Sequence, residues 1–257
     1  MIILSILPFV KCCWLVSTHH LEFVWLKPPQ MREGRVRGVP ESRQGLGPAP
    51  HSPANNTKIY IGNSIMTKQE FLRLASRFPV AAALKSNEEI EIALNSDALL
   101  LFMLKGDAFQ LKPFVEQAHK KGKGFVVHVD LVSGIGKDRA GIQYLHQIGV
   151  DAIITSRSQL VSAGHAEGLI TIQRLLLVDD SALETGVRTI ARAAPDIVEV
   201  LPGIIFPEIA TTLQQLLPGP FIAGGFIRNA TEVARIRAAG AIMSSSSTYA
   251  LWNRTSS

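Results

Sequence analysis

The sequence predicts an α/β fold, a compact (β/α)8 TIM-type barrel with a disordered N-terminal extension. From residue 78 onward, eight short apolar runs alternate with amphipathic segments, and successive runs begin roughly 18 to 27 residues apart. Four of the amphipathic segments end in a glycine directly before the next run. Each period fits one strand and one helix, and eight parallel strands with right-handed crossovers close into a barrel. An open doubly wound sheet is the alternative, but no run has the character of an edge strand.

Each apolar run is bounded by polar residues, glycine or proline, as is typical of a strand buried on both faces. The expected strands are Val80–Leu84, Ala98–Leu104, Phe125–Val129, Ala152–Thr155, Leu169–Val178, Ile197–Leu201, Phe221–Ala223 and Ala241–Met243.

The segments between the runs have helix-capping residues at their ends. Asn87 or Ser86 is the N-cap candidate of the first segment and Asn229 that of the last, Pro207 suits a first helical turn, and a C-terminal glycine suits the residue after a helix. Asp179, Asp180 and Glu184 are interpreted as acids at a helix N-terminus. The expected helices are Asn87–Leu94, Leu111–Lys121, Asp138–Ile148, Ser158–Glu167, Ala182–Ala194, Pro207–Leu217 and Asn229–Ala239.

Residues 1–65 are expected to lie outside the barrel domain, which is assigned to residues 66–257. The apolar run Met1–Val10 is too short to span a bilayer and ends at Lys11, and the flanks of a secretory signal are missing. Prolines and glycines then crowd residues 28–53, which predicts a disordered or irregular segment. Met66 is a plausible alternative start.

Composition excludes several classes of protein. The 257 residues are 47% hydrophobic and 18% charged, which excludes a chain disordered throughout. The two cysteines, Cys12 and Cys13, are adjacent, which excludes a disulfide scaffold and a cysteine zinc cluster, and their use fits a reducing, cytoplasmic setting. Most of the net charge of +5 lies in residues 1–65, so the barrel is nearly neutral and bulk charge says little about nucleic acid. The basic run Lys120, Lys121 and Lys123 is interpreted as a solvated helix end, with an RNA-contacting surface as the alternative.

Functional residues are expected at the carboxyl ends of the strands, where barrels of this kind carry their sites. Gly224 and Gly225 follow the seventh strand, and the serine run Ser244–Ser247 is expected to form a polar loop after the eighth. Paired glycines let backbone amides approach an anion, and loops seven and eight are the usual phosphate pocket of such barrels. These loops therefore predict a phosphorylated small ligand.

Other polar residues at strand ends allow more than one role. His128 and Asp130 share a face and could bind ligand hydroxyls, act as an acid–base pair or form a structural pair. Glu199 needs a cationic partner if it is buried, with Arg157 and Arg174 as the candidates. Arg228 is a third arginine near a strand end. No third metal ligand is evident near His128 and Asp130.

Six ordered stretches resemble the glycerol 3-phosphate responsive antiterminator family, the glycerol uptake operon antiterminator regulatory proteins. The resemblance covers about residues 78–252 and rests on His128–Leu131, Ile153–Ser158, Ile172–Leu175, Ser181–Thr185, Glu199–Gly203 and Ile222–Arg228. It implies a regulator without enzymatic turnover or a cofactor. Such a regulator binds glycerol 3-phosphate and then the leader mRNA of glycerol operons, and it prevents a terminator hairpin.

Strand-end positions suggest which residues would bind this ligand. Phosphate contacts are expected from Gly203, Gly224, Gly225, Ser246 and Ser247, and hydroxyl contacts from Asp130, Arg157, Gln173 and Glu199. The chain has Ser246-Ser247-Thr248 where the family tends to have Thr-Ser-Asn, and Tyr249 follows where a charged residue is common. A homodimer is a further expectation, and no membrane partner is expected.

Two other functions remain open at this point. A barrel enzyme acting on a small phosphorylated substrate would use the same phosphate pocket, with His128 and Asp130 as its acid–base candidates. A phosphate-ligand sensor that acts through a protein partner is the third reading.

Overall fold

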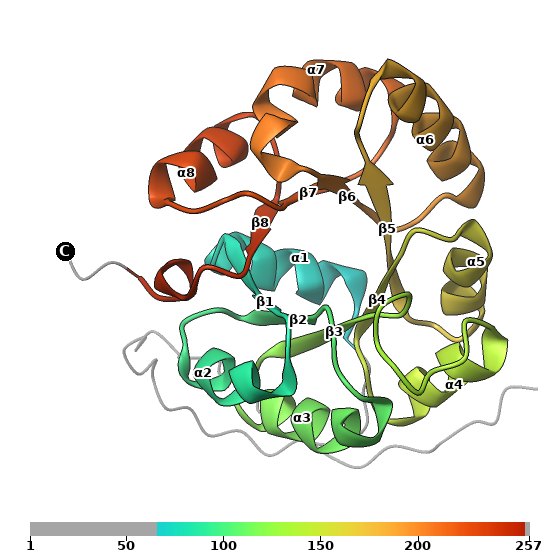
Figure 1. Ribbon diagram of the computed structural model, residues 1–257, viewed down its shortest axis with the longest axis vertical. Helices are drawn as coiled ribbons and strands as arrows, with labels where there is room; N and C mark the ends of the chain where they lie inside the picture. Colours follow the sequence, from blue (N-terminus) through green and yellow to red (C-terminus); the bar gives the residue numbers. More distant parts are fainter. Residues whose placement is uncertain (1–65, 255–257) are drawn as a thin grey trace, which may run out of the picture. The chain divides into compact units, whose positions relative to one another are not determined.

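The computed structural model describes residues 66–254, in which eight parallel strands form a closed barrel, as predicted (Figure 1). Each strand pairs with the next, and β8 pairs with β1. The strands are β1 (Val80–Leu84), β2 (Leu100–Met103), β3 (Gly124–His128), β4 (Ala152–Thr155), β5 (Ile170–Leu176), β6 (Ile197–Leu201), β7 (Phe221–Gly224) and β8 (Met243–Ser246). The predicted disordered or irregular extension, residues 1–65, lies outside the described residues.

In the described residues a helix follows each of the first seven strands and covers the outside of the barrel, and one more helix precedes the first strand (Figure 1). They are α1 (Lys68–Arg77), α2 (Ile90–Asn95), α3 (Ala108–Lys120), α4 (Arg139–Gln147), α5 (Ser158–Ala166), α6 (Asp180–Ala193), α7 (Phe206–Leu216) and α8 (Ala230–Ala238), with 3-10 turns η1 (Asn87–Glu89), η2 (Gly203–Ile205) and η3 (Tyr249–Trp252). The four glycines expected at helix ends, Gly122, Gly149, Gly168 and Gly240, all have positive φ. Asp179 is the N-cap of α6, as expected.

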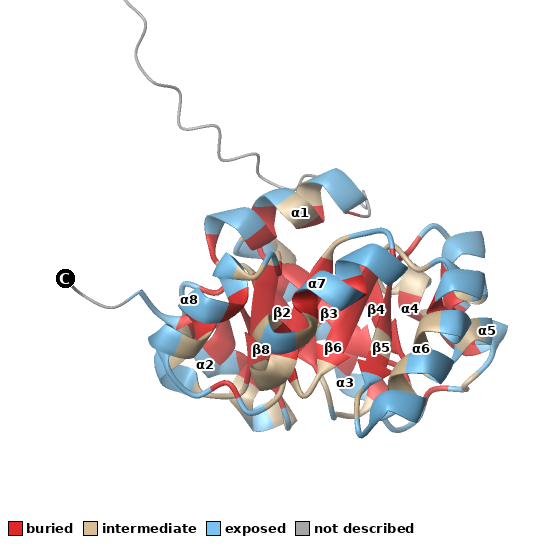
Figure 2. Cartoon of the chain, turned by 90° about the horizontal axis from the view of Figure 1, so that it is seen from above, coloured by how far each residue is buried: buried red, intermediate tan, exposed pale blue. Residues whose placement is uncertain are grey.

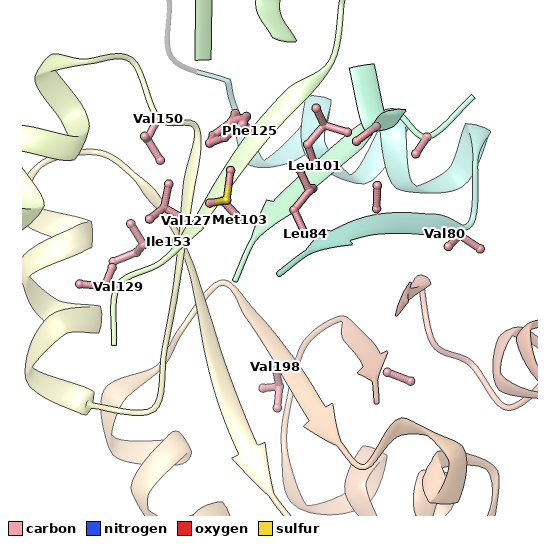
Figure 3. Packing of buried hydrophobic residues seen from close by; sticks show 14 of the residues in the cluster. Val80, Leu84, Leu101, Met103, Phe125, Val127, Val129, Val150, Ile153 and Val198 are labelled. Carbon is pink, nitrogen blue, oxygen red and sulfur yellow. The ribbon is translucent and has the colours of Figure 1, made fainter. Parts of the chain in front are cut away.

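The barrel has two apolar layers because alternate residues of each strand face opposite ways. Outward side chains such as Leu101, Val127 and Ile153 pack against the helices (Figure 3). Inward side chains such as Phe102, Ile154 and Ile172 fill the barrel interior. Buried residues accordingly line the strands, while the outer faces of the helices are exposed (Figure 2). The strand positions therefore determine which polar side chains reach the interior.

Helix α1 was not expected, and it closes the amino end of the barrel. Phe71 and Leu74 of α1 are buried in the interior cluster together with Ala81, and the helix lies over one end of the strands in Figure 2. Thr67 caps the helix by accepting from the amide of Glu70 at 3.2 Å. The amino end is thus sealed, and the opposite end carries the mouth of the barrel.

Two expectations from the sequence need correction. The serine run is not a loop: Ser244, Ser245 and Ser246 belong to β8 and are buried. The basic run is not wholly solvated, because Lys123 is buried and donates to the carbonyls of Ala93 at 2.9 Å and Ser96 at 2.6 Å. These carbonyls lie at the C-terminal end of α2, where a cation is favoured. Burial lowers the pKa of Lys123 to about 8.

Within residues 66–254, no helix has the length and apolar character needed to cross a bilayer.

Candidate functional site

A cavity of about 380 Å³ opens at the carboxyl ends of β1, β7 and β8. Five residues of the predicted ligand set line it: Glu199, Gly224, Gly225, Ser246 and Ser247. The other lining residues are Ala83, Lys85, Leu104, Arg174, Leu201, Phe226, Ile227, Arg228, Ser245 and Thr248. The glycine pair and the serine run therefore meet at one site, as the sequence predicted.

Gly224 ends β7 and Gly225 follows it, and a different steric reason favours glycine at each position. A Cβ on Gly224 would lie 2.5 Å from Ser245 Oγ and 2.8 Å from Glu199 Oε1, so only glycine leaves room for these polar atoms. Gly225 has φ of +88°, which side chains rarely adopt, and no heavy atom lies closer than 3.8 Å to its would-be Cβ. Gly225 thus lines the cavity in a backbone conformation that glycine adopts readily and other residues do not.

The serines of β8 hold the cavity wall together. Ser245 Oγ donates to Glu199 Oε1 at 2.8 Å, and Ser246 Oγ donates to the carbonyl of Ile227 at 2.7 Å. The same Ser246 hydroxyl accepts from the amide of Thr248 at 3.1 Å. Ser246 thus holds the loop after β7 in place. The half-buried Ser247 lines the cavity, and its hydroxyl forms no hydrogen bond with any described residue.

A buried ion pair forms the floor of the cavity. Arg174 and Glu199 are register partners on β5 and β6, and both point inward. Arg174 Nε and Nη2 each lie 2.8 Å from Glu199 Oε2, and the two side chains are 10% and 1% exposed. The partner of Glu199 is thus Arg174 rather than Arg157. With Ser245 on its other oxygen, Glu199 has polar partners on both sides.

Lys85 and Arg228 give the cavity its charge. Both are exposed, and among the residues that the structure describes neither side chain forms an ion pair or a hydrogen bond. Lys85 follows β1, and Arg228 follows β7 just before α8. The lining contains three cations and one carboxylate, which leaves a surplus of two positive charges. Such a surplus suits a dianion.

Asp130 and Arg157, predicted as ligand residues, lie outside the cavity lining. Asp130 accepts from Thr155 Oγ1 at 3.1 Å and from the amide and hydroxyl of Ser156 at 2.7 and 3.0 Å. Arg157 Nε lies 3.4 Å from Asp130 Oδ1. Burial alone would raise the pKa of Asp130, but these hydrogen bonds outweigh burial and lower it. This group fastens the loop between β4 and α5.

Gln173 and Gly203 also lie outside the lining. Gln173 alternates with the inward residues of β5, so it faces α5, where its Nε2 donates to Ser158 Oγ at 3.2 Å. A Cβ on Gly203 would lie 2.5 Å from the amide nitrogen of Gly224, so this glycine lets η2 pack directly on β7. Both residues are buried and structural in their contacts.

His128 is an inward, buried residue at the end of β3. It is 3% exposed, and neither ring nitrogen has a hydrogen-bond partner among residues 66–254. Burial and the nearby charge of Arg174 lower the pKa of His128 to about 4, so the ring is neutral near pH 7. No group of three or more histidine, cysteine, aspartate or glutamate side chains in the described range is placed to hold a metal ion.

Lys85 was not among the predicted site residues, although its position in the sequence could have indicated it. Lys85 directly follows the first predicted strand, so the rule that places residues at the carboxyl ends of strands also places Lys85 at the barrel mouth. Ser245 was seen only as part of a loop, because its strand was expected to end at Met243.

This chain is similar in sequence to known proteins. A sequence profile described as glycerol-3-phosphate responsive antiterminator matches residues 80–252. An uncharacterised protein of Escherichia coli K12, YgcP, is 29% identical over 182 residues, which cover 70% of this chain and 95% of that protein.

Two solved structures are also similar. A glycerol uptake operon antiterminator regulatory protein from Listeria monocytogenes is 34% identical with a TM-score of 0.64, and the match covers 68% of this chain and 94% of that one. A glycerol uptake operon antiterminator-related protein from Thermotoga maritima is 27% identical with a TM-score of 0.61, covering 68% and 98% of the two chains. Because the profile matches residues 80–252, which is more than half of the chain and most of the barrel, this chain belongs to the glycerol-3-phosphate responsive antiterminator family.

Proposed function

We propose that the cavity at β1, β7 and β8 binds glycerol 3-phosphate, and that the liganded protein binds the leader mRNA of glycerol-utilisation genes and prevents termination. The observation that carries the ligand proposal is the surplus of two positive charges beside the Gly224–Gly225 backbone and the Ser247 hydroxyl. Regulation by antitermination is the activity that the name of the Listeria relative gives for that protein. Such a regulator would act in the cytoplasm.

The phosphate end of the ligand is proposed to lie between Lys85, Arg228 and the loop at Gly225. A phosphate monoester carries nearly two negative charges at neutral pH, which matches two unpaired cations. Arginine binds phosphate oxygens through a planar fork, and lysine contributes a point charge. The Ser247 hydroxyl lines the same cavity and can donate to an ester oxygen.

The hydroxyl end is proposed to lie on the floor formed by Glu199 and Arg174. Each Glu199 oxygen already accepts from one side chain, yet a carboxylate oxygen can accept more than one hydrogen bond. The fixed position of Glu199 would favour a polyol over an apolar ligand. Asp130, Arg157, Gln173 and Gly203 are proposed to act as scaffold, since their contacts fix loops and strand packing.

We propose a regulator rather than an enzyme. The acid–base candidate from the sequence is His128, whose pKa of about 4 makes it a weak base near neutrality. Its predicted partner Asp130 is held by Thr155 and Ser156. Neither group lines the cavity.

Calorimetry and RNA binding with the full chain test this proposal. Glycerol 3-phosphate should bind more tightly than glycerol or inorganic phosphate, because it alone contacts both ends of the cavity. A leader transcript of the organism's own glycerol operon should bind more tightly when glycerol 3-phosphate is present, at two salt concentrations. Equal RNA affinity with and without the ligand would disprove the switch.

Gly225→Val tests the placement of the ligand. A β-branched residue is strained at φ of +88° and would displace the backbone that lines the cavity, so ligand affinity should be lost. Gly168→Val is the matched control, because Gly168 has φ of +77° with nothing within 4 Å and precedes β5 at the other end of the barrel. Both variants should lose similar stability, and only Gly225→Val should lose the ligand. Unchanged ligand affinity in Gly225→Val would show that the ligand binds elsewhere on the protein.

A further inference from the structure

Every exposed aromatic side chain in residues 66–254 lies on one arc of the barrel mouth. Phe109 is 84% exposed, Phe226 66% and Tyr249 43%. They follow β2, β7 and β8, and β7, β8, β1 and β2 are consecutive neighbours in the barrel. We call these three rings and three exposed cations that follow the same four strands, Lys85, Lys105 and Arg228, the aromatic arc; Phe109 lies in the first turn of α3, and Tyr249 begins η3.

The positive charges of the aromatic arc are uncommitted, whereas most nearby acids are occupied. Lys85, Lys105 and Arg228 form no side-chain ion pair with any described residue. Asp107 caps α3 by accepting from the amide of Phe109 at 3.1 Å. Glu89 accepts from the Tyr249 hydroxyl at 2.9 Å and from the amide of Lys85 at 2.6 Å. Exposed aromatic rings therefore alternate with cations that are free to bind an anionic chain.

The opposite loops differ in the kind of apolar residue that they expose. After β3 and β5 the exposed large side chains are Leu131, Leu176 and Val178, all aliphatic. Unpaired bases stack on aromatic rings, and their phosphates attract arginine and lysine. The aromatic arc combines both kinds of side chain and so fits single-stranded nucleic acid, whereas the exposed apolar residues after β3 and β5 offer no ring.

We propose that the aromatic arc is the surface that contacts single-stranded RNA, with Phe109, Phe226 and Tyr249 stacking on bases and Lys105 contacting the backbone. This inference rests on the proposed function and adds the place of the RNA. The arc borders the ligand cavity, because Phe226, Lys85 and Arg228 belong to both. A ligand held by the loop after β7 would therefore fix the position of an RNA-contacting ring.

The test uses variants of arc residues that do not line the cavity. Phe109→Ala and Tyr249→Leu should each weaken binding of the glycerol-operon leader transcript at least about fivefold in the presence of glycerol 3-phosphate. Lys105→Gln should reduce the slope of the logarithm of RNA affinity against the logarithm of salt concentration by about one, because one phosphate contact is lost. All three should bind glycerol 3-phosphate as the unmodified chain does.

Matched controls come from exposed residues elsewhere. Val178→Ala removes a side chain that is 87% exposed on the aliphatic side, and Arg192→Gln removes an exposed cation in the last turn of α6, away from the barrel mouth. Both should bind RNA normally. A transcript containing 4-thiouridine should cross-link to peptides with Phe109, Phe226 or Tyr249.

The outcomes separate this inference from the function. If the unmodified chain binds RNA with its ligand and the arc variants bind equally well, the arc assignment is wrong and the function stands. Cross-links at Leu131, Leu176 or Val178 would also overturn it. If the unmodified chain binds no RNA in the presence of glycerol 3-phosphate, the arc and the RNA part of the function are both wrong.

Discussion

The two halves of the barrel mouth carry similar charged side chains, which are paired on one half and unpaired on the other. On the β3–β5 side, Asp130 and Arg157 contact each other, and Asp130 also accepts from Thr155 and Ser156. On the β7–β1 side, Lys85 and Arg228 surround a cavity without a carboxylate partner among the described residues. Groups that satisfy one another build the scaffold, and groups left unsatisfied around a cavity can bind a ligand.

The Arg174–Glu199 pair lies between the two halves and belongs to both. Its hydrogen bonds are complete within the protein, as on the β3–β5 side. It nevertheless forms the cavity floor. Breaking it should therefore affect stability and ligand binding together, which makes it the most sensitive point of the comparison.

Glu199→Ala should have the largest effect. The variant leaves Arg174, only 10% exposed, without its partner, and breaking a buried pair in this way costs about 3–5 kcal/mol of unfolding free energy. Urea denaturation measures this loss. The double variant Arg174→Met/Glu199→Leu should recover much of the stability without recovering ligand binding. A loss below about 1 kcal/mol in Glu199→Ala would show that the pair is not buried as described.

The pH dependence of stability should reveal the buried imidazole of His128. Its folded-state pKa is about 4, below the ordinary value of 6.5, so its contribution is fully present above pH 6.5 and disappears as the pH falls toward 4. The shift corresponds to a free-energy change on the order of 3 kcal/mol. His128→Gln should flatten the stability curve in this window, as measured by urea denaturation from pH 4 to 8.

His119 provides an opposing control. Its hydrogen bond with the buried Asp151, at 2.9 Å, raises the pKa of His119 above 6.5. The resulting stability is present below pH 6.5 and is lost as the pH rises through the folded-state pKa. Stability should thus be highest near pH 6.5. An unchanged curve in His128→Gln would show that this ring is hydrated in the folded protein.

Hydrophobic periodicity and turn residues predicted the fold closely. Val80–Leu84, Ala152–Thr155 and Ile197–Leu201 match the observed strands, because a parallel strand buried on both faces requires a continuous apolar run. The eighth strand was misplaced, because serines inside a barrel have the same composition as serines in a loop. The capping signal of α1 at Thr67 and Glu70 was present but lay next to the segment interpreted as disordered.

Five of the predicted ligand residues line the cavity. Gly224, Gly225, Ser246 and Ser247 lie at or just beyond a strand end, and Glu199 points inward from the middle of β6. Gln173 was misplaced, because a run apolar on both faces hides which residues point inward. Which acid pairs with which arginine depends on strand register, and composition does not encode register.

The comparison between the two halves can finally be tested with one arginine from each. Arg228→Gln removes an exposed, unpaired guanidinium from the cavity, so glycerol 3-phosphate affinity should fall at least about tenfold, the value of one charge-assisted hydrogen bond. Arg157→Gln removes a side chain that is 50% exposed and paired with Asp130, and it should leave the affinity unchanged. Both variants should unfold like the unmodified chain, because exposed ion pairs contribute little stability. Calorimetry compares the two affinities directly. If Arg157→Gln weakens the ligand as much as Arg228→Gln, then the Asp130–Arg157 contact opens when the ligand binds, and pairing in the free protein does not separate scaffold from site.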